Sequence, residues 1–270
     1  MPFKTTIFKI IAVVIICAAI SFFVFFPAQL EKQTNLLHDS IVPVISEQAK
    51  TLHGQLFIGD WHSDTLLWKR DLMDKHDYGH VDIPRLQQGN VALQMFTTVT
   101  KSPDGLNYEG NSSDASDNIT KLALMSLWPA NTWDSLAERA LFQASKALEL
   151  VDEFPQQVSL ITSKTDLSQF LLQRKINPKL LGMLLGTEGS HALDGDLNNI
   201  KRLFDSGFRM MSLQHFFDNK LGGSLHGESG EGLTAFGREA LQRMQSLGIM
   251  LDVSHSSEKV VQDVLAISRQ

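Results

Sequence analysis

His62 and Asp64 are two side chains whose types and spacing could bind a metal ion together. They directly follow the apolar run Leu56–Ile58, in the stretch Gly-Asp-Trp-His-Ser-Asp at residues 59–64. In an extended segment, side chains two positions apart point to the same side, so an imidazole and a carboxylate at this spacing can bind one ion. Such pairs also occur in ordinary loops, so this pair alone is a weak indication of a metal site.

Three further candidate ligands also come after apolar runs that have the length of a strand. They are Glu188 after residues 181–185, His215 after residues 209–213 and His255 after residues 249–253. Barrel enzymes collect their active-site residues on the loops that follow the carboxyl ends of their strands. A surface loop explains any one of these residues, but four strands that end in this way favour a metal-dependent hydrolase. Nitrogen and oxygen donors suit zinc, with manganese or iron as less favoured ions.

The segments that must position these side chains alternate between strand-like and helix-like patterns. Strands are predicted at 56–58, 91–98, 158–161, 181–185, 209–213 and 249–253, and helices at 134–154, 197–205, 236–247 and 258–268, with a further helix capped by Thr165. This alternation predicts an α/β protein with a parallel sheet, which a doubly wound fold and a barrel share. The polar residues that follow four of the strands favour the barrel.

The amino-terminal segment predicts a membrane anchor. Residues Ile7–Phe26 are almost all apolar, with Lys9 as the only charge, and roughly 20 such residues in a helix cross the ~30 Å hydrocarbon core of a bilayer. Lys4 and Lys9 lie at the start of this segment. The positive-inside rule therefore places the amino terminus in the cytoplasm and the rest of the chain on the extracytoplasmic side, periplasmic or extracellular. A cleaved signal peptide is the alternative, although residues 25–28 (Phe-Phe-Pro-Ala) form a poor cleavage site.

The chain divides into three regions on this basis. We expect residues 1–29 to be a cytoplasmic stub and a transmembrane helix, residues 30–54 a linker, and residues 55–270 an incomplete metal-dependent hydrolase barrel. The formal net charge of −6 is made of mixed charges without a Lys/Arg-rich run, so nucleic acid is not an expected partner. The single cysteine, Cys17, lies in the apolar segment, which excludes a disulfide framework and a cysteine-rich zinc site. Any metal is therefore expected to be held by histidines and carboxylates.

Several short stretches of the chain resemble the membrane (renal-type) dipeptidases, a zinc-dependent family. They are Asp-Trp-His-Ser-Asp at 60–64, Glu-Gly-Ser-His at 188–191, Ser-Leu-Gln-His-Phe-Phe-Asp-Asn at 212–219, Gly-Leu-Thr-Ala-Phe-Gly at 232–237 and Leu-Asp-Val-Ser-His-Ser at 251–256. The resemblance runs from about Phe57 to Gln270, in the order of the family. It implies a (β/α)8 TIM-type barrel with two zinc ions, which hydrolyses dipeptides through a hydroxide that bridges the metals.

The resemblance also implies a role for each candidate residue. His62 and Asp64 would ligate the first zinc, Glu188 would bridge both ions, and His255 would ligate the second. His215 is similar to the family histidine that contacts the substrate and steadies the oxyanion, so Glu188 and His215 are the expected catalytic residues. A dipeptide is the expected substrate and the lipid bilayer the expected partner of the amino-terminal helix, while a homodimer stays open.

The chain departs from the family pattern in two places. Ser190 stands where the family often has glycine, which is a mild change. The family also uses a later histidine for the second zinc, an arginine for the substrate carboxylate and a late aspartate, and a further helix, loop and strand need roughly 20 residues. Only 15 residues follow His255, and their pattern predicts a helix. We therefore expect a barrel that lacks about its last two strands and a 270-residue chain with little or no dipeptidase activity.

Two other functions are compatible with the pattern. Another amidohydrolase-like barrel hydrolase usually carries His-x-His after its first strand, and Asp64 in place of the second histidine disfavours that class. A membrane-anchored zinc-binding pseudoenzyme would keep the barrel without the catalysis. If the chain ends at Gln270, the absence of the later ligands favours this alternative.

A few side chains outside the ligand set could take part in the function. His226, in a glycine-rich loop, could line the pocket, and His191 could support Glu188 through a hydrogen bond. Trp128 and Trp133 could contact the outer leaflet of a membrane or form part of a lid.

Overall fold

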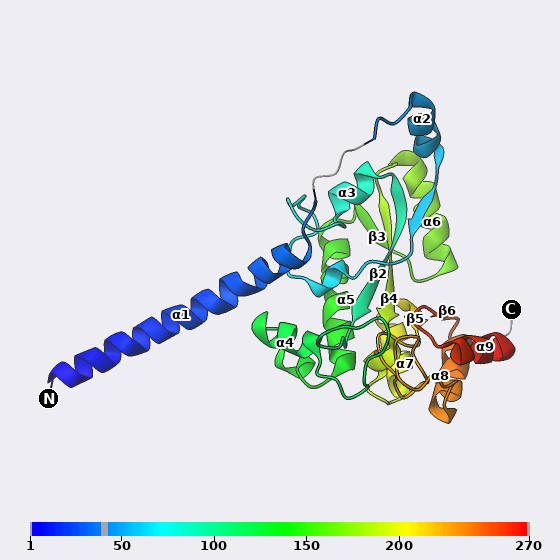
Figure 1. Cartoon of the computed structure of the whole chain (residues 1–270). Helices are drawn as coiled ribbons and strands as arrows, with labels where there is room; N and C mark the ends of the chain where they lie inside the picture. Colours follow the sequence, from blue (N-terminus) through cyan, green and yellow to red (C-terminus); the bar gives the residue numbers. More distant parts are fainter. Residues whose placement is uncertain (1, 39–42, 269–270) are drawn as a thin grey trace.

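The computed structural model describes residues 2–38 and 43–268, and its centre is a parallel β-sheet (Figure 1). The strands of the sheet are β1 (Ile58–Asp60), β2 (Val91–Val99), β3 (Val158–Leu160), β4 (Leu181–Glu188), β5 (Phe208–Ser212) and β6 (Met250–Asp252). The pairings between these strands are all parallel. The predicted α/β class with a parallel sheet is therefore confirmed.

Helices and short 3-10 turns connect the strands and cover the sheet. The helices are α1 (Pro2–Thr34), α2 (Glu47–Gln55), α3 (Ile83–Gln88), α4 (Asn118–Met125), α5 (Leu136–Glu153), α6 (Lys164–Ile176), α7 (Asn198–Asp205), α8 (Ala235–Ser246) and α9 (Glu258–Ile267). The 3-10 turns are η1 (Thr65–Leu67), η2 (Ala130–Thr132) and η3 (Ser190–Leu193). The helices predicted from apolar spacing correspond to α5, α7, α8 and α9.

The order of the strands is that of a half-barrel. Strands β1, β2, β4, β5 and β6 lie side by side in chain order, which is the strand order of a TIM-type barrel. Strand β3 departs from this order, because it pairs with the first half of β4 at Leu181–Met183, while β5 pairs with the second half from Leu185 onward. The sequence-based count took β3 as one of six successive barrel strands. An apolar run identifies a strand but carries no information about its neighbours, which explains the difference.

Strand β4 is buried along its whole length because the sheet is covered on both faces. Figure 1 shows α3 and α5 on one side of the sheet and α6 on the other. The adjacent residues Met183 and Leu184 accordingly belong to two different apolar clusters, and the second of these contains Phe170 of α6. Gly182 makes this close packing feasible, because a Cβ at this position would lie 2.6 Å from the side chains of Ile161 and Leu93. A continuous apolar run such as 181–185 is typical of a parallel strand buried on both faces.

The amino-terminal end of α6 corrects one sequence-based expectation. The side chain of Ser163, not that of Thr165, caps the helix by accepting a hydrogen bond from the Asp166 N–H. Ser163 has the extended backbone that an N-cap residue requires, whereas Thr165 already lies in the first turn.

Helix α1 extends away from the rest of the protein as a long rod (Figure 1). It continues past Pro27 to Thr34, so it enters the region that the sequence assigned to the linker. By length and composition α1 can cross a membrane, a test that a signal sequence would also pass. The last turns of α1 contact the domain through Glu31, whose carboxylate lies 3.5 Å from the Arg70 guanidinium.

Candidate metal centre

The side chains predicted to bind metal meet at the carboxyl edge of the sheet. His62 and Asp64 follow β1, and Glu188 is the last residue of β4. His215 and His255 lie on the loops that follow β5 and β6. Because parallel strands all end at the same edge, residues that are far apart in the sequence come together there.

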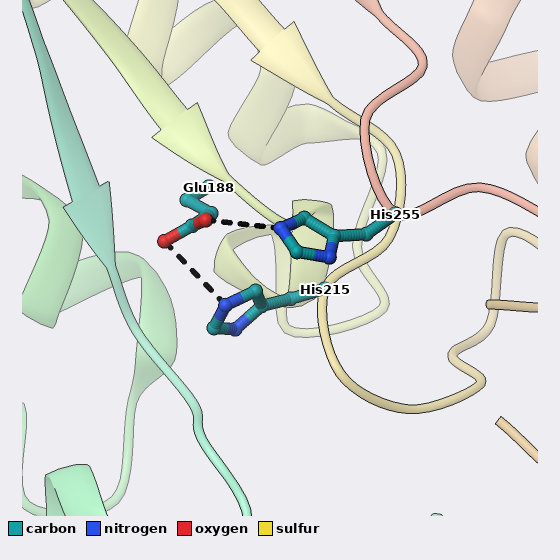
Figure 2. Close-up of side chains that lie close together, drawn as sticks. All are labelled: Glu188, His215 and His255. Atoms are coloured by element: carbon teal, nitrogen blue, oxygen red, sulfur yellow. Dashed lines mark ion pairs between the residues drawn. The ribbon is translucent and has the colours of Figure 1, made fainter. Parts of the chain in front are cut away.

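The Glu188 carboxylate is the centre of this arrangement. Its Oε1 lies 3.4 Å from His62 Nε2 and 3.3 Å from His255 Nε2, and its Oε2 lies 3.5 Å from His215 Nε2. Figure 2 shows the His215 and His255 rings converging on the two carboxylate oxygens. Asp64 Oδ2 adds a contact of 3.2 Å to His62 Nε2.

These side chains form two overlapping sets of donors. One set contains His62, Asp64 and Glu188, and the other contains Glu188, His215 and His255. Within each set the donor atoms lie within 4.8 Å of one another, so either set could hold a metal ion, and Glu188 belongs to both. The sequence assigned His215 to the substrate, whereas the structure also brings its ring within reach of an ion bound at the second set.

The electrostatics of the cluster fit a cation at its centre. Hydrogen bonds to Asp64 and Glu188 raise the pKa of His62. Burial acts to raise the pKa of Glu188, but the imidazoles of His255, His62 and His215 outweigh it and hold this pKa well below its usual range. A carboxylate surrounded by ring nitrogens is stable only if those nitrogens carry protons or share a metal ion with it. Imidazole and carboxylate donors are the ligand types that zinc takes in hydrolases, so the residues present fit such an ion.

Neighbouring groups orient the candidate ligands. Thr97 Oγ1, near the end of β2, donates a hydrogen bond of 2.5 Å to Asp64 Oδ1. His215 Nδ1 lies 3.1 Å from the Lys101 carbonyl oxygen, which directs Nε2 toward Glu188. Sequence reasoning missed Thr97 and Lys101. The sequence indicates these two residues only weakly. Strand β2 also ends at the carboxyl edge, but it carries no histidine or acid there.

The backbone that presents His255 is constrained. His255 has a φ of +62°, a left-handed conformation that is uncommon for residues other than glycine and occurs often at functional sites. The Ser224 hydroxyl contacts the carbonyl oxygens of both His215 and His255, at 2.5 and 3.1 Å. The Leu225 N–H adds a bond of 2.8 Å to the His255 carbonyl. The loop after β5 thus holds the backbone of both histidines at once.

The other histidines singled out in the sequence differ in their relation to the site. The His226 ring stacks on Phe216 and lies 5.2 Å from the His255 ring, so it is next to the candidate ligands. His191 makes no hydrogen bond to Glu188; neither of its buried ring nitrogens has a partner among the described residues. Burial lowers the pKa of His191 to about 3, so its ring is neutral. Its edge packs against Phe217 instead.

The fold and the site together define a parallel half-barrel with a candidate metal centre at the carboxyl edge of its strands. A family model described as "Membrane dipeptidase (Peptidase family M19)" matches residues 46–270. The chain therefore belongs to the membrane dipeptidase family, a family of metal-dependent peptidases, as its sequence motifs predicted.

Individual relatives agree with this assignment. Dipeptidase 3 of Mus musculus is 26% identical over 245 residues, an alignment that covers 84% of this chain and 42% of the mouse protein. Dipeptidase 3 of Rattus norvegicus is 27% identical over 245 residues, with the same two coverages. The chain thus spans less than half the length of these curated relatives.

Solved structures show the same fold. The probable dipeptidase PvdM from Pseudomonas aeruginosa has a TM-score of 0.59 at 18% identity, covering 83% of this chain and 52% of that one. A metallopeptidase from Rhodobacter sphaeroides, liganded with a phosphinate mimic of the dipeptide L-Ala-D-Ala, has a TM-score of 0.55 at 21% identity. That match covers 79% of this chain and 62% of the Rhodobacter chain.

Proposed function

We propose that this chain forms the zinc centre of a dipeptidase that hydrolyses the peptide bond of dipeptides. The observation that carries the proposal is the position of Glu188, whose carboxylate lies within 3.5 Å of ring nitrogens from three different loops. His62, Asp64 and Glu188 are the proposed ligands of one zinc ion. Glu188 and His255 are proposed ligands of a second, with Glu188 as the bridge.

The proposed mechanism divides the work between metal and protein. Two bound zinc ions would activate a water molecule at neutral pH and polarise the scissile carbonyl. His215 is the proposed substrate contact. Its Nδ1 faces a carbonyl oxygen and therefore carries a proton, and a second proton on the ring would let Nε2 donate to the oxyanion. Burial lowers the pKa of His215, and the negative charge of Glu188 beside it favours the protonated form.

The proposed location of the reaction follows from α1. We propose that α1 is an uncleaved single-pass anchor with its amino terminus in the cytoplasm, because Lys4 and Lys9 lie at that end of the apolar segment. The half-barrel would then lie on the extracytoplasmic side and would bind its dipeptide substrates there.

Catalysis is proposed to need more ligands than residues 1–270 contain. The resemblance implies a later histidine, arginine and aspartate, so residues 1–270 alone are expected to have little or no activity. The coding DNA beyond the codon for Gln270 is therefore the first thing to read. A reading frame that continues into a strand ending in histidine would supply the complete enzyme for assay. A stop codon at that point would favour a zinc-binding pseudoenzyme.

The activity test uses the complete product of the reading frame and L-Ala-D-Ala as the probe. We expect release of free alanine that EDTA abolishes and zinc restores. Glu188→Gln should abolish this release, while Glu228→Gln, a change of the same type at an exposed residue, should leave it unchanged. Hydrolysis that survives both EDTA and Glu188→Gln would exclude the proposed metal mechanism.

A further inference from the structure

Helix α1 is attached to the domain over several turns. Glu31 is only 3% exposed, and the Arg70 side chain beside it is 2% exposed. Lys32 pairs with Asp77 at 2.7 Å, and the Asn35 carbonyl accepts a bond of 2.8 Å from the backbone N–H at residue 79. These contacts attach the carboxyl-terminal end of α1 to the domain.

The attachment continues into the apolar part of α1. Phe23, Val24 and Pro27 line a cavity of about 140 Å³ together with Arg70 and Ser126 of the domain. Ser126 is the residue that ends α4, and α4 contacts α1. Figure 1 shows α4 at the side of the domain that faces α1. Because the apolar stretch of α1 ends at Phe26, Ser126 lies level with the end of the stretch proposed to span the membrane.

The residues around Ser126 expose apolar side chains. Leu124 is 42% exposed, Leu127 61% and Trp133 38%; we call these three residues the α4 edge. Trp128, which the sequence grouped with Trp133, is buried and packs against Phe142, so only Trp133 of this pair remains available to a partner. Exposed tryptophan and leucine near the end of a membrane span are typical of side chains at the lipid–water interface.

Leu127 occupies a backbone position where glycine is normally preferred. The Trp128 N–H bonds the Ala123 carbonyl at 2.9 Å and the Leu127 N–H bonds the Leu124 carbonyl at 3.3 Å, which is the Schellman pattern of a helix end. Leu127 therefore has a φ of +53°, the left-handed conformation that glycine adopts without strain. The side chain of Leu127 is 61% exposed, so it gains little burial within the fold and is available to another surface.

We propose that the α4 edge inserts into the outer lipid–water interface next to α1, so that the bilayer is a second contact surface of the half-barrel. This proposal rests on α1 as a membrane anchor and is independent of the proposed catalysis. The occupant is lipid because α4 contacts α1, and Ser126 at the end of α4 shares a cavity with Phe23 and Val24 of the apolar part of α1. Lys69, which also lines that cavity and is exposed, lies where anionic lipid headgroups would be.

The test measures membrane depth by spin labelling of the full chain in lipid vesicles. Cys17→Ala removes the single native cysteine, and Leu127→Cys then carries the label. Leu172→Cys on α6 is the matched control, because Leu172 is 62% exposed. Val14→Cys reports the depth of α1. We expect the label at position 127 to lie within about 5–10 Å of the headgroup–acyl boundary, the label at 172 to be in water, and the label at 14 to be in hydrocarbon.

Three results would overturn the proposal. The first is a label at 127 that is as accessible to a water-soluble relaxant as the label at 172. The second is a label at 14 outside the hydrocarbon, since the α4 edge would then have no bilayer beside it. The third is dipolar broadening between labels at 127, which would show that a second copy of the chain covers the α4 edge.

A second variant examines the same residue without lipid. Leu127→Gly relieves the left-handed backbone, so the melting temperature in detergent should be equal to or higher than that of the wild type. A clear loss of stability would mean that Leu127 packs within the fold, and would contradict the proposal.

Discussion

Glu188 belongs to both sets of candidate metal ligands. Its side chain is only 10% exposed, yet it remains ionised because imidazoles surround it. Its own position depends on β4, and the positions of its partners depend on the loops after β1, β5 and β6. The centre is therefore sensitive to the groups that orient the ligands as well as to the ligands themselves.

Thr97 is the clearest of these orienting groups. Thr97→Val removes the hydrogen bond to Asp64 Oδ1 while keeping the shape of the side chain. We expect zinc affinity to fall by about 10–100-fold, the usual effect of losing a group that orients a metal ligand. Competition with a chelator of known affinity measures this fall.

Thr98→Val is the matched control for this change. The adjacent Thr98 contacts the carbonyl oxygen of residue 186 rather than a candidate ligand. Its replacement should leave the zinc affinity unchanged. Equal affinities for Thr97→Val and the wild type would show that Thr97 has no role in orienting Asp64.

At the scale of elements, α5 connects the sheet to the long loop that follows β2. Arg139 of α5 is 1% exposed. Its guanidinium pairs with Asp117 at 2.6 Å and donates to the Thr100 carbonyl at 2.9 Å, just beyond the end of β2. This pair helps to fix the Thr100–Lys101 backbone, whose Lys101 carbonyl contacts His215.

Arg139→Met should strongly destabilise the protein. Removal of one partner leaves the Asp117 carboxylate without its buried counter-charge, which costs about 3–5 kcal/mol of unfolding free energy. Arg202→Met is the control, because the Arg202–Glu138 pair has an arginine side chain that is 48% exposed, and exposed pairs contribute up to about 1 kcal/mol. Denaturant unfolding followed by circular dichroism measures both values, and equal losses would contradict this role of Arg139.

Lys146, also in α5, should make stability depend on pH. Burial lowers the pKa of Lys146 to about 8, from 10.5 for an unperturbed lysine. Between these values the unfolded chain binds more protons than the folded chain, so the unfolding free energy contributed by Lys146 rises with pH. The total rise is on the order of 3 kcal/mol.

Lys146→Met removes this contribution. The difference in unfolding free energy between the wild type and Lys146→Met should therefore grow in favour of the wild type from pH 8 to pH 10.5. Lys201→Met, at a side chain that is 71% exposed, should leave the pH dependence unchanged. Parallel pH profiles for the wild type and Lys146→Met would contradict the lowered pKa.

At the scale of the whole molecule, local sequence patterns predict the strands and the ligand set. The apolar run at 181–185 corresponds to β4, and the structure brings the polar residues that follow the strands together around Glu188. Both results depend on local patterns, namely the hydrophobic periodicity of an element and the residue type at its end.

Features that depend on contacts between distant segments could not be predicted in this way. The pairing of β3 with β4, the bond from Thr97 to Asp64 and the Glu31–Arg70 pair each join segments that are separated in the chain. The left-handed backbone of His255 depends likewise on the loop that carries Ser224. None of these contacts has a spacing or composition that identifies it in one sequence.

The zinc content of Glu188→Gln tests whether a metal ion binds at the cluster around Glu188. The full chain and the variant are purified in detergent, dialysed against the same free zinc concentration and analysed by mass spectrometry. We expect the wild type and the control Glu228→Gln to retain zinc and Glu188→Gln to lose most of it, because Glu188 belongs to both donor sets. Equal zinc in all three proteins would contradict a metal centre built around Glu188.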